Sequence, residues 1–183
     1  MSLASYPATV IPPSILPPYS SGYYPPSHVS LNSTGTAITA DRLYGTPLVV
    51  PYKLTLASLM IFCTLNPAGN VRLGVYRSDA SYLPGALLLD AGAVAIGTTG
   101  SKIAVVNRVL VPGVYWMAAV FDTSTPTIRV GGLPCAWMGF TSQSDLVFKD
   151  GVDAAFAYAA LPDPFTAGYA PVQNCPRIYA QVT

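Results

Sequence analysis

The fold is indicated most clearly by residues Val71 to Phe121, which read VRLGVYRSDASYLPGALLLDAGAVAIGTTGSKIAVVNRVLVPGVYWMAAVF. Its apolar runs are Val71–Tyr76, Leu87–Ala91, Ile103–Val106 and Tyr115–Phe121, and the segments between them are rich in Ser, Asp, Pro and Gly. Proline fixes φ near the value that the second position of a turn needs, and glycine accepts positive φ at the next position. Apolar runs of about four to eight residues, rich in β-branched and aromatic side chains and separated by turns, predict antiparallel strands. We therefore expect a β-sandwich core here.

The composition points to a surface that other protein covers. The chain has 183 residues, of which 51% are apolar and 9% charged, and it contains no glutamate. An average soluble domain has roughly 25% charged residues, so this one is poorly protected against association. The length suits one domain with a proper core. A net charge of +1 supports neither nucleic-acid binding nor attraction to acidic membranes.

No targeting or membrane signal is expected. The first residues lack both a basic region and an apolar region of signal-peptide type, and no apolar run approaches the roughly 20 residues that span a bilayer. The cysteines are Cys63, Cys135 and Cys175, an odd number without C-x-x-C spacing. They are typical of small buried side chains in a protein made in a reducing cytosol. A single disulfide between two of them is the alternative.

Residues 1–40 differ from the rest of the chain, and we call them the arm. The arm contains no charged residue, and it has seven prolines, at positions 7, 12, 13, 17, 18, 25 and 26. Proline pairs favour an extended, polyproline-like chain over helix or central strand. Tyrosines offer a large contact area with a polar tip, and a chain that is already extended loses less entropy on docking. We predict that the arm docks on a neighbouring protein surface, through Tyr6, Tyr19, Tyr23 and Tyr24; the alternatives are a flexible linker or a wrap over its own domain.

Residues 41–183 are predicted to form the sandwich domain, because charges begin at Asp41. A first strand is expected over Leu43–Tyr52, at an edge of the sheet, since Pro47 and Pro51 cannot donate to a ladder. Leu54–Leu65 predicts a long strand, closed by a hairpin turn over residues 66–70.

The last third of the chain is less regular. Thr127–Val130 predicts a short strand, and the alternation of Arg177–Val182 predicts the final one. The alanine-rich run Ala154–Leu161 fits either a helical turn or a loop.

A search for catalytic chemistry gives no site. His28 is the single histidine and lies in the arm, where nothing rigid would hold an imidazole for catalysis. His28 and the three cysteines lack the paired spacing of a zinc site. Asp145, Asp150 and Asp153 could in principle hold calcium, but aspartates of this spacing are more often turn formers. We predict no catalytic residue, no cofactor and no metal site, and a protein that is not an enzyme.

The two tryptophans need a separate argument. Trp116 and Trp137 could stack on sugar rings, but both stand in apolar runs, which favours burial in the core.

The central stretch resembles a known family. The strings RLGVYRSDASYLPGALLLDAG (72–92), TTGSK (98–102) and LVPGVYWMAAV (110–120) resemble a pattern in virion proteins of tailed bacteriophages, of the head-decoration or cement, tail-fibre and receptor-binding types. The resemblance covers about residues 40–125 and rests on turn and core residues. It implies a jelly-roll-like β-sandwich in a structural component of the particle, often trimeric, and it transfers no catalytic residue.

Two functions follow as hypotheses. The first is a non-enzymatic virion protein, made in the bacterial cytoplasm, which attaches to capsid or tail proteins through its arm and sandwich. The alternative is a module whose loops recognise a host glycan. A glycan module needs only a short tether, so a long arm rich in Pro and Tyr favours the first. We expect a homo-oligomer, most simply a trimer, with other virion proteins as partners and neither nucleic acid nor membrane among them.

Overall fold

The computed structural model of the chain describes residues 22–24, 35–65, 69–123, 126–131 and 149–183. Every regular element in these residues is a β-strand. No helix among them is long and apolar enough to cross a membrane. The prediction of an all-β fold is therefore confirmed.

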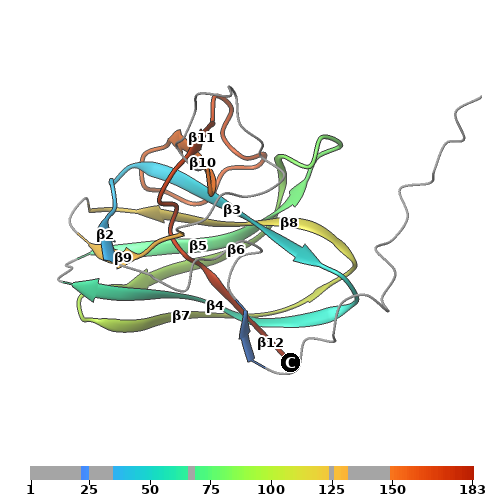
Figure 1. The fold of residues 1–183 in the computed structure, drawn as a ribbon, viewed down its shortest axis with the longest axis horizontal. Helices are drawn as coiled ribbons and strands as arrows, with labels where there is room; N and C mark the ends of the chain where they lie inside the picture. Colours follow the sequence, from blue (N-terminus) through green and yellow to red (C-terminus); the bar gives the residue numbers. More distant parts are fainter. Residues whose placement is uncertain (1–21, 25–34, 66–68, 124–125, 132–148) are drawn as a thin grey trace, which may run out of the picture.

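The strands of the described residues form two six-stranded antiparallel sheets that pack face to face (Figure 1). Sheet A contains β1 (Gly22–Tyr24), β12 (Tyr179–Val182), β4 (Leu54–Leu65), β9 (Thr127–Arg129) and β2 (Gly35–Ala37), in that order, with β7 (Gly100–Leu110) paired to β4. Sheet B contains, in order, β11 (Ala170–Val172), β10 (Gly151–Ala155), β3 (Arg42–Val50), β8 (Gly113–Phe121), β5 (Asn70–Ser78) and β6 (Pro84–Ala95).

The central strands follow a nested pairing. β3 pairs with β8, β4 with β7, and β5 with β6. These three pairs form a long two-stranded ribbon that crosses from sheet B to sheet A and back. The pairing of β5 with β8 closes the roll. The winding is that of a jelly roll, so the predicted antiparallel, jelly-roll-like sandwich is confirmed.

The central strands of sheet B, β3 and β8, are buried on both faces. Tyr115 and Met117 of β8 pack into the core between the sheets. Trp116 and Ala118 point the other way, into a second cluster that contains Leu161 and Phe165 of the segment after β10, together with other residues of sheet B. A strand covered on both faces needs apolar side chains at successive positions, which explains the unbroken run of β8.

The turn predicted over residues 66–70 is not a hairpin turn. β4 lies in sheet A and β5 in sheet B, so the connection crosses between the sheets. β4 has β7 along one edge and β12 and β9 along the other, which leaves no edge for β5. Turn-forming residues indicate a reversal of the chain, but not which partner the next strand finds.

The first strand was predicted to lie at an edge of the sheet, and this is wrong for the first half of the strand. β3 lies between β8 and β10, but β10 pairs only with Arg42–Gly45. Beyond Gly45, β3 has β8 as its one ladder partner in the described residues, and Pro47 lies in that half. The proline therefore marks a local edge within a central strand.

The choice that the sequence left open over Ala154–Leu161 is now settled. Ala154 and Ala155 end β10, and the residues after them form no helix. Leu161 is 6% exposed and belongs to the second cluster.

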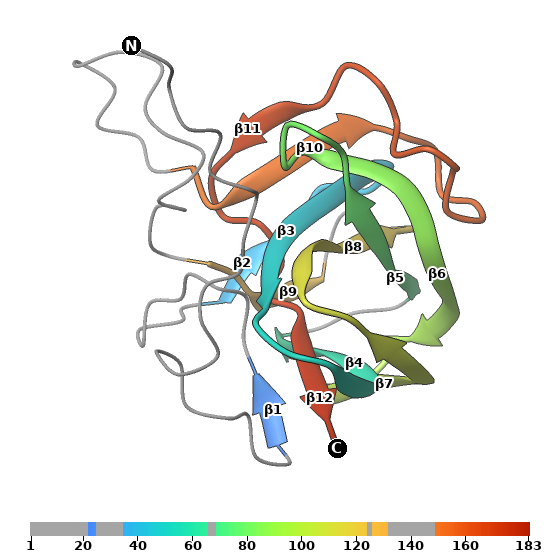
Figure 2. The same cartoon turned by 90° about the vertical axis from the view of Figure 1, so that its right-hand side faces the viewer.

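Part of the arm belongs to the sheets. β1 pairs with β12 and β2 with β9, so both strands extend sheet A (Figure 2). Ile38 is 3% exposed and packs in the core between the sheets. The sandwich thus begins upstream of Asp41. Residues 1–21 and 25–34 lie outside the described residues. The extended conformation expected of this part of the arm therefore stays a prediction.

A carboxylate holds the loop after β10 to sheet B. Asp90 on β6 accepts two hydrogen bonds from Nε of Arg72, at 2.9 and 2.8 Å, and one from the backbone N–H of Leu161 at 3.0 Å. It also accepts from the backbone N–H of Gly92, at 2.9 Å. This carboxylate therefore connects β5, β6 and the loop.

We expect Asp90→Ala to lower the free energy of unfolding by about 2–3 kcal/mol, because it leaves a half-buried guanidinium and a backbone N–H without their acceptor. Chemical denaturation measures this change. Arg77→Ala, at an exposed position of β5, is the control and should change it by less than about 0.5 kcal/mol. Equal losses in the two variants would contradict the role given to Asp90.

Candidate functional site

The residues singled out in the sequence are only partly described by the structure. Tyr23 and Tyr24 lie on β1, where their backbones pair with Gln181 and Ala180. The remaining ones outside the described residues are Tyr6, Tyr19, His28, Cys135, Trp137 and Asp145. The docking role of the arm tyrosines therefore stays a prediction.

Several other expectations can be compared with the structure. Trp116 is 1% exposed, so its predicted burial is confirmed. Cys63 and Cys175 are buried free thiols, as expected of small core side chains. Asp153 binds Arg42 through its side chain, while Asp150 is buried elsewhere. Among the described residues, no group of three His, Cys, Asp or Glu side chains is placed to hold a metal.

The outer face of β7 carries exposed apolar side chains. We call Ile103, Val105, Val109 and Val111 the β7 row; the first three lie on β7, and Val111 directly follows it. They are 43%, 73%, 50% and 52% exposed, respectively. Met60 of β4 lies beside Ile103 in the register and is itself partly exposed. Exposed apolar side chains that gather along one strand of a sheet are typical of an interaction surface.

The sequence could not identify this row. β7 has apolar residues on both faces, since Ala104 and Leu110 point into the core while their neighbours point out. Which of two apolar faces is covered depends on the sheet packing. Asn107, at φ +49°, is part of an irregularity in the β4–β7 register and interrupts the alternation.

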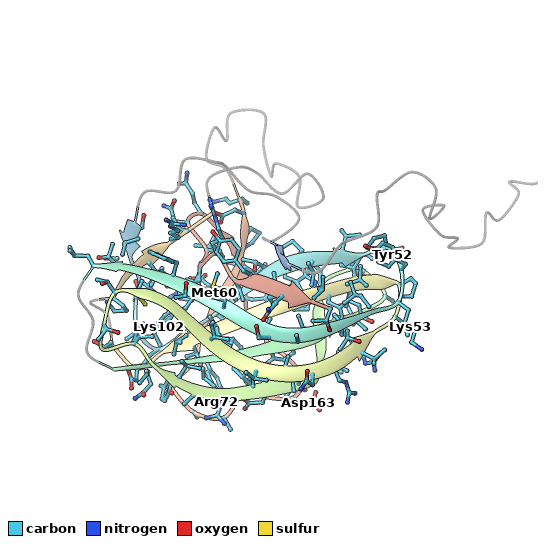
Figure 3. The ribbon with its side chains drawn as sticks, turned by 90° about the horizontal axis from the view of Figure 1, so that it is seen from below. Tyr52, Lys53, Met60, Arg72, Lys102 and Asp163 are labelled. Carbon is cyan, nitrogen blue, oxygen red and sulfur yellow. The ribbon has the colours of Figure 1, made fainter. Side chains whose placement is uncertain are left out.

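The charges near this face have one sign. In the described residues, the strands of sheet A carry Lys102, Arg108 and Arg129 and no carboxylate. Lys53 stands just before β4; Figure 3 shows Lys53 and Lys102 toward opposite ends of the molecule, in a view that also labels Met60. The described aspartates all lie on sheet B or in loops. A partner of sheet A should therefore present apolar groups flanked by carboxylates.

A second surface feature is a cavity of about 280 Å³ on sheet B. Its lining comes from the turn between β5 and β6, from β8, from β10 and from the region of β11. The side chains that form most of its wall are Tyr82, Leu83, Trp116, Val152, Tyr169 and Pro171. We call it the Tyr82 pocket. It is mainly apolar, and none of the described residues that line it is charged.

The backbone at Tyr82 is fixed in an unusual conformation. Its φ is +63°, a left-handed value that costs about 1–2 kcal/mol for a residue with a Cβ. The Asp79 carboxylate accepts hydrogen bonds from the N–H groups of Ser81 and Leu83, at 2.8 and 2.9 Å. The indole N–H of Trp116 donates to the carbonyl of Tyr82 at 3.0 Å. These bonds hold the Tyr82 side chain at the pocket, 58% exposed.

Asp150 is a buried carboxyl with an unusual pKa. Oδ1 accepts the backbone N–H of Cys175 at 3.0 Å, whereas Oδ2 has no hydrogen-bond partner. Burial raises the pKa of Asp150 to about 6, and backbone N–H groups oppose that shift only in part. A Cβ at position 131 would lie 2.4 Å from Oδ2, so Gly131 is required for this packing.

The raised pKa of Asp150 predicts a pH effect on stability. A carboxyl whose pKa rises on folding stabilises the protein fully below its unfolded pKa, 3.8, and this contribution is lost as the pH rises through about 6. We expect the contribution of Asp150 to the free energy of unfolding to fall by about 2–3 kcal/mol between pH 4 and pH 7. Asp150→Asn should remove this loss, so the stability of the variant relative to the parent chain should increase as the pH rises. A constant difference in unfolding free energy, measured by urea denaturation at both pH values, would refute this.

Comparisons with protein-family models, with curated proteins and with solved structures returned no match for this chain.

Proposed function

We propose that this protein is a non-enzymatic structural component of a bacteriophage virion, which docks on capsid or tail proteins through its N-terminal arm and its sandwich. The sequence resemblance over residues 40–125 suggests the particle, and the jelly-roll winding agrees with it. Capsid decoration, cement and fibre-base positions all fit this description.

The β7 row is the observation that carries the proposal. Four β-branched side chains, 43–73% exposed, stand on one face of a protein with only 9% charged residues. Transfer of apolar surface from water is worth about 25 cal/mol per Å², so a partner that covers this strip stabilises the assembly. A protein that acts by attachment needs such a surface, and it needs no reactive side chain.

The partners that we propose are other virion proteins and further copies of this chain. In the described residues, the strands of sheet A carry cations and no carboxylate, which favours a heterologous contact, between sheet A of one copy and a carboxylate-bearing surface of the next, over a contact between two sheet A faces. A heterologous contact closes into a ring when the rotation between neighbouring copies permits it. A trimer is the ring that the resemblance favours.

The test is mass spectrometry of purified particles together with a cryo-EM map of them. We expect the chain to be present in a symmetric arrangement, with the β7 row against another protein. Its location in the virion then distinguishes capsid from tail. Absence of the chain from purified particles would overturn the proposal.

Recognition of a host glycan is the second candidate, and two tyrosines of the Tyr82 pocket are the observation in its favour. Tyr82 and Tyr169 are partly exposed aromatic side chains on which a sugar ring could stack. The described residues that line the pocket include no carboxylate, amide or guanidinium side chain to bond several sugar hydroxyls. A glycan array discriminates: binding that Tyr82→Ala abolishes would support this function over attachment.

A further inference from the structure

We propose that the Tyr82 pocket binds a proline-rich segment of the arm, residues 11–19 (IPPSILPPY), from a neighbouring copy of this chain. This inference rests on the docking role proposed above for the arm, and it names one surface on which the arm docks.

The pocket has the chemistry of a site for proline rings. Three aromatic side chains, Tyr82, Trp116 and Tyr169, line it together with aliphatic groups. Aromatic-lined grooves of this kind bind polyproline segments, because the rigid ligand loses little entropy and its rings pack flat on aromatic faces. Trp116 is 1% exposed and its indole N–H is already bonded to the Tyr82 carbonyl, so it forms the floor. The hydroxyl groups of Tyr82, Tyr169 and Ser81 could donate hydrogen bonds to peptide carbonyls of the ligand.

The conformation of Tyr82 indicates that the pocket is prepared for a ligand. A left-handed backbone costs free energy, and most chains place glycine or asparagine at such positions. Here a large aromatic residue is held there by the Asp79 and Trp116 hydrogen bonds, with most of its side chain exposed. Neither the core nor the turn requires an aromatic side chain at an exposed position. A ligand that covers Tyr82 accounts for it.

The same chain supplies a matching segment. Residues 11–19 contain two proline pairs, two isoleucines, one leucine and one tyrosine, and no charge. This composition matches a pocket whose described lining residues carry no charge. A hexose presents several hydroxyl groups and would leave them without strong partners in such a pocket.

Geometry favours a neighbouring copy over the arm of the same copy. The arm enters the fold at β1, beside β12, whereas the pocket is built from the β5–β6 turn and the β10–β11 region. In both Figure 1 and Figure 2 these lie at opposite ends of the sandwich. Pro18 is four residues from Gly22 and reaches about 12–14 Å from it, and Pro12, ten residues away, reaches about 31–35 Å when fully extended. A domain of this length is about 40 Å across, so even a fully extended segment falls short of its own pocket.

Cross-linking of full-length chains tests this. One chain carries Ser14→Cys and a second, of different tag size, carries Ser81→Cys, both in a Cys135→Ser background; Cys63 and Cys175 are buried. Under mild oxidation we expect a covalent heterodimer. Adding Tyr82→Ala to the second chain should lower its yield at least tenfold. Ser101→Cys, at an exposed serine on β7, replaces Ser81→Cys in the matched control and should give at least tenfold less product.

Competition and dilution complete the test. Free IPPSILPPY peptide should suppress the heterodimer, whereas hexoses at the same concentration should not. In a chain that carries both cysteines, excess parental chain should compete the cross-link away. Equal yields in the Ser101→Cys control, suppression by hexoses, or an intrachain disulfide that survives dilution would each overturn the inference. The proposed function is tested separately, by the presence of the chain in particles, so either can fail alone.

Discussion

Replacement of Val105 by aspartate should prevent association through sheet A and leave the sandwich as stable as before. Val105 is 73% exposed in the single chain, so the substitution should change the free energy of unfolding by no more than about 0.5 kcal/mol. In an assembly the new carboxylate would lie unpaired against apolar surface, which costs several kcal/mol. A loss of about 3 kcal/mol corresponds to a more than hundredfold weaker association. Light scattering across a concentration series measures the strength of association, and thermal unfolding checks that the variant is folded.

The matched control places the same charge on the other side of the molecule. Ala159→Asp lies at an exposed position in the loop that covers sheet B, and it should associate like the parent chain. If the parent chain remains a monomer at micromolar concentration, or if Val105→Asp associates normally, the β7 row is not a contact between copies. Binding of Val105→Asp to particles would extend that conclusion to the other virion proteins.

Removal of the arm in two steps should separate docking from folding. Deletion of residues 1–21 stops before β1, so it removes no described strand, and the thermal midpoint should stay close to that of the full chain. Incorporation into particles should fall more than tenfold, because buried aromatic anchors such as Tyr19 commonly contribute about 2 kcal/mol or more each. Tyr6→Ala and Tyr19→Ala should each give part of this loss.

Deletion of residues 1–38 should have a different effect. It removes β1, β2 and Ile38, which is buried in the core, so we expect the free energy of unfolding to fall by at least about 3 kcal/mol. Chemical denaturation of the two truncated chains tests the contrast. If the chain that lacks residues 1–21 is incorporated normally, the arm is a passive tail. If that chain is unfolded, residues 1–21 stabilise their own domain.

The all-β class and the bounds of many strands follow from local patterns in the sequence. Leu54–Leu65 coincides with β4, and Thr127–Val130 and Arg177–Val182 contain β9 and β12. These predictions succeed because side-chain alternation, β-branched residues and turn formers act over a few neighbouring residues. The burial of Trp116 and of Cys63 follows from the same local composition.

The pairing of the strands and the exposure of their faces depend on how the whole chain packs. The turn residues at 66–70 are compatible with a hairpin, yet β4 and β5 lie in different sheets because other strands occupy both edges of β4. β7 and β8 are both apolar at successive positions, but only β8 is covered on both sides, so the β7 row is exposed. The Tyr82 pocket joins residues between positions 81 and 171. Pairing and burial depend on contacts between distant segments, and no local pattern contains them.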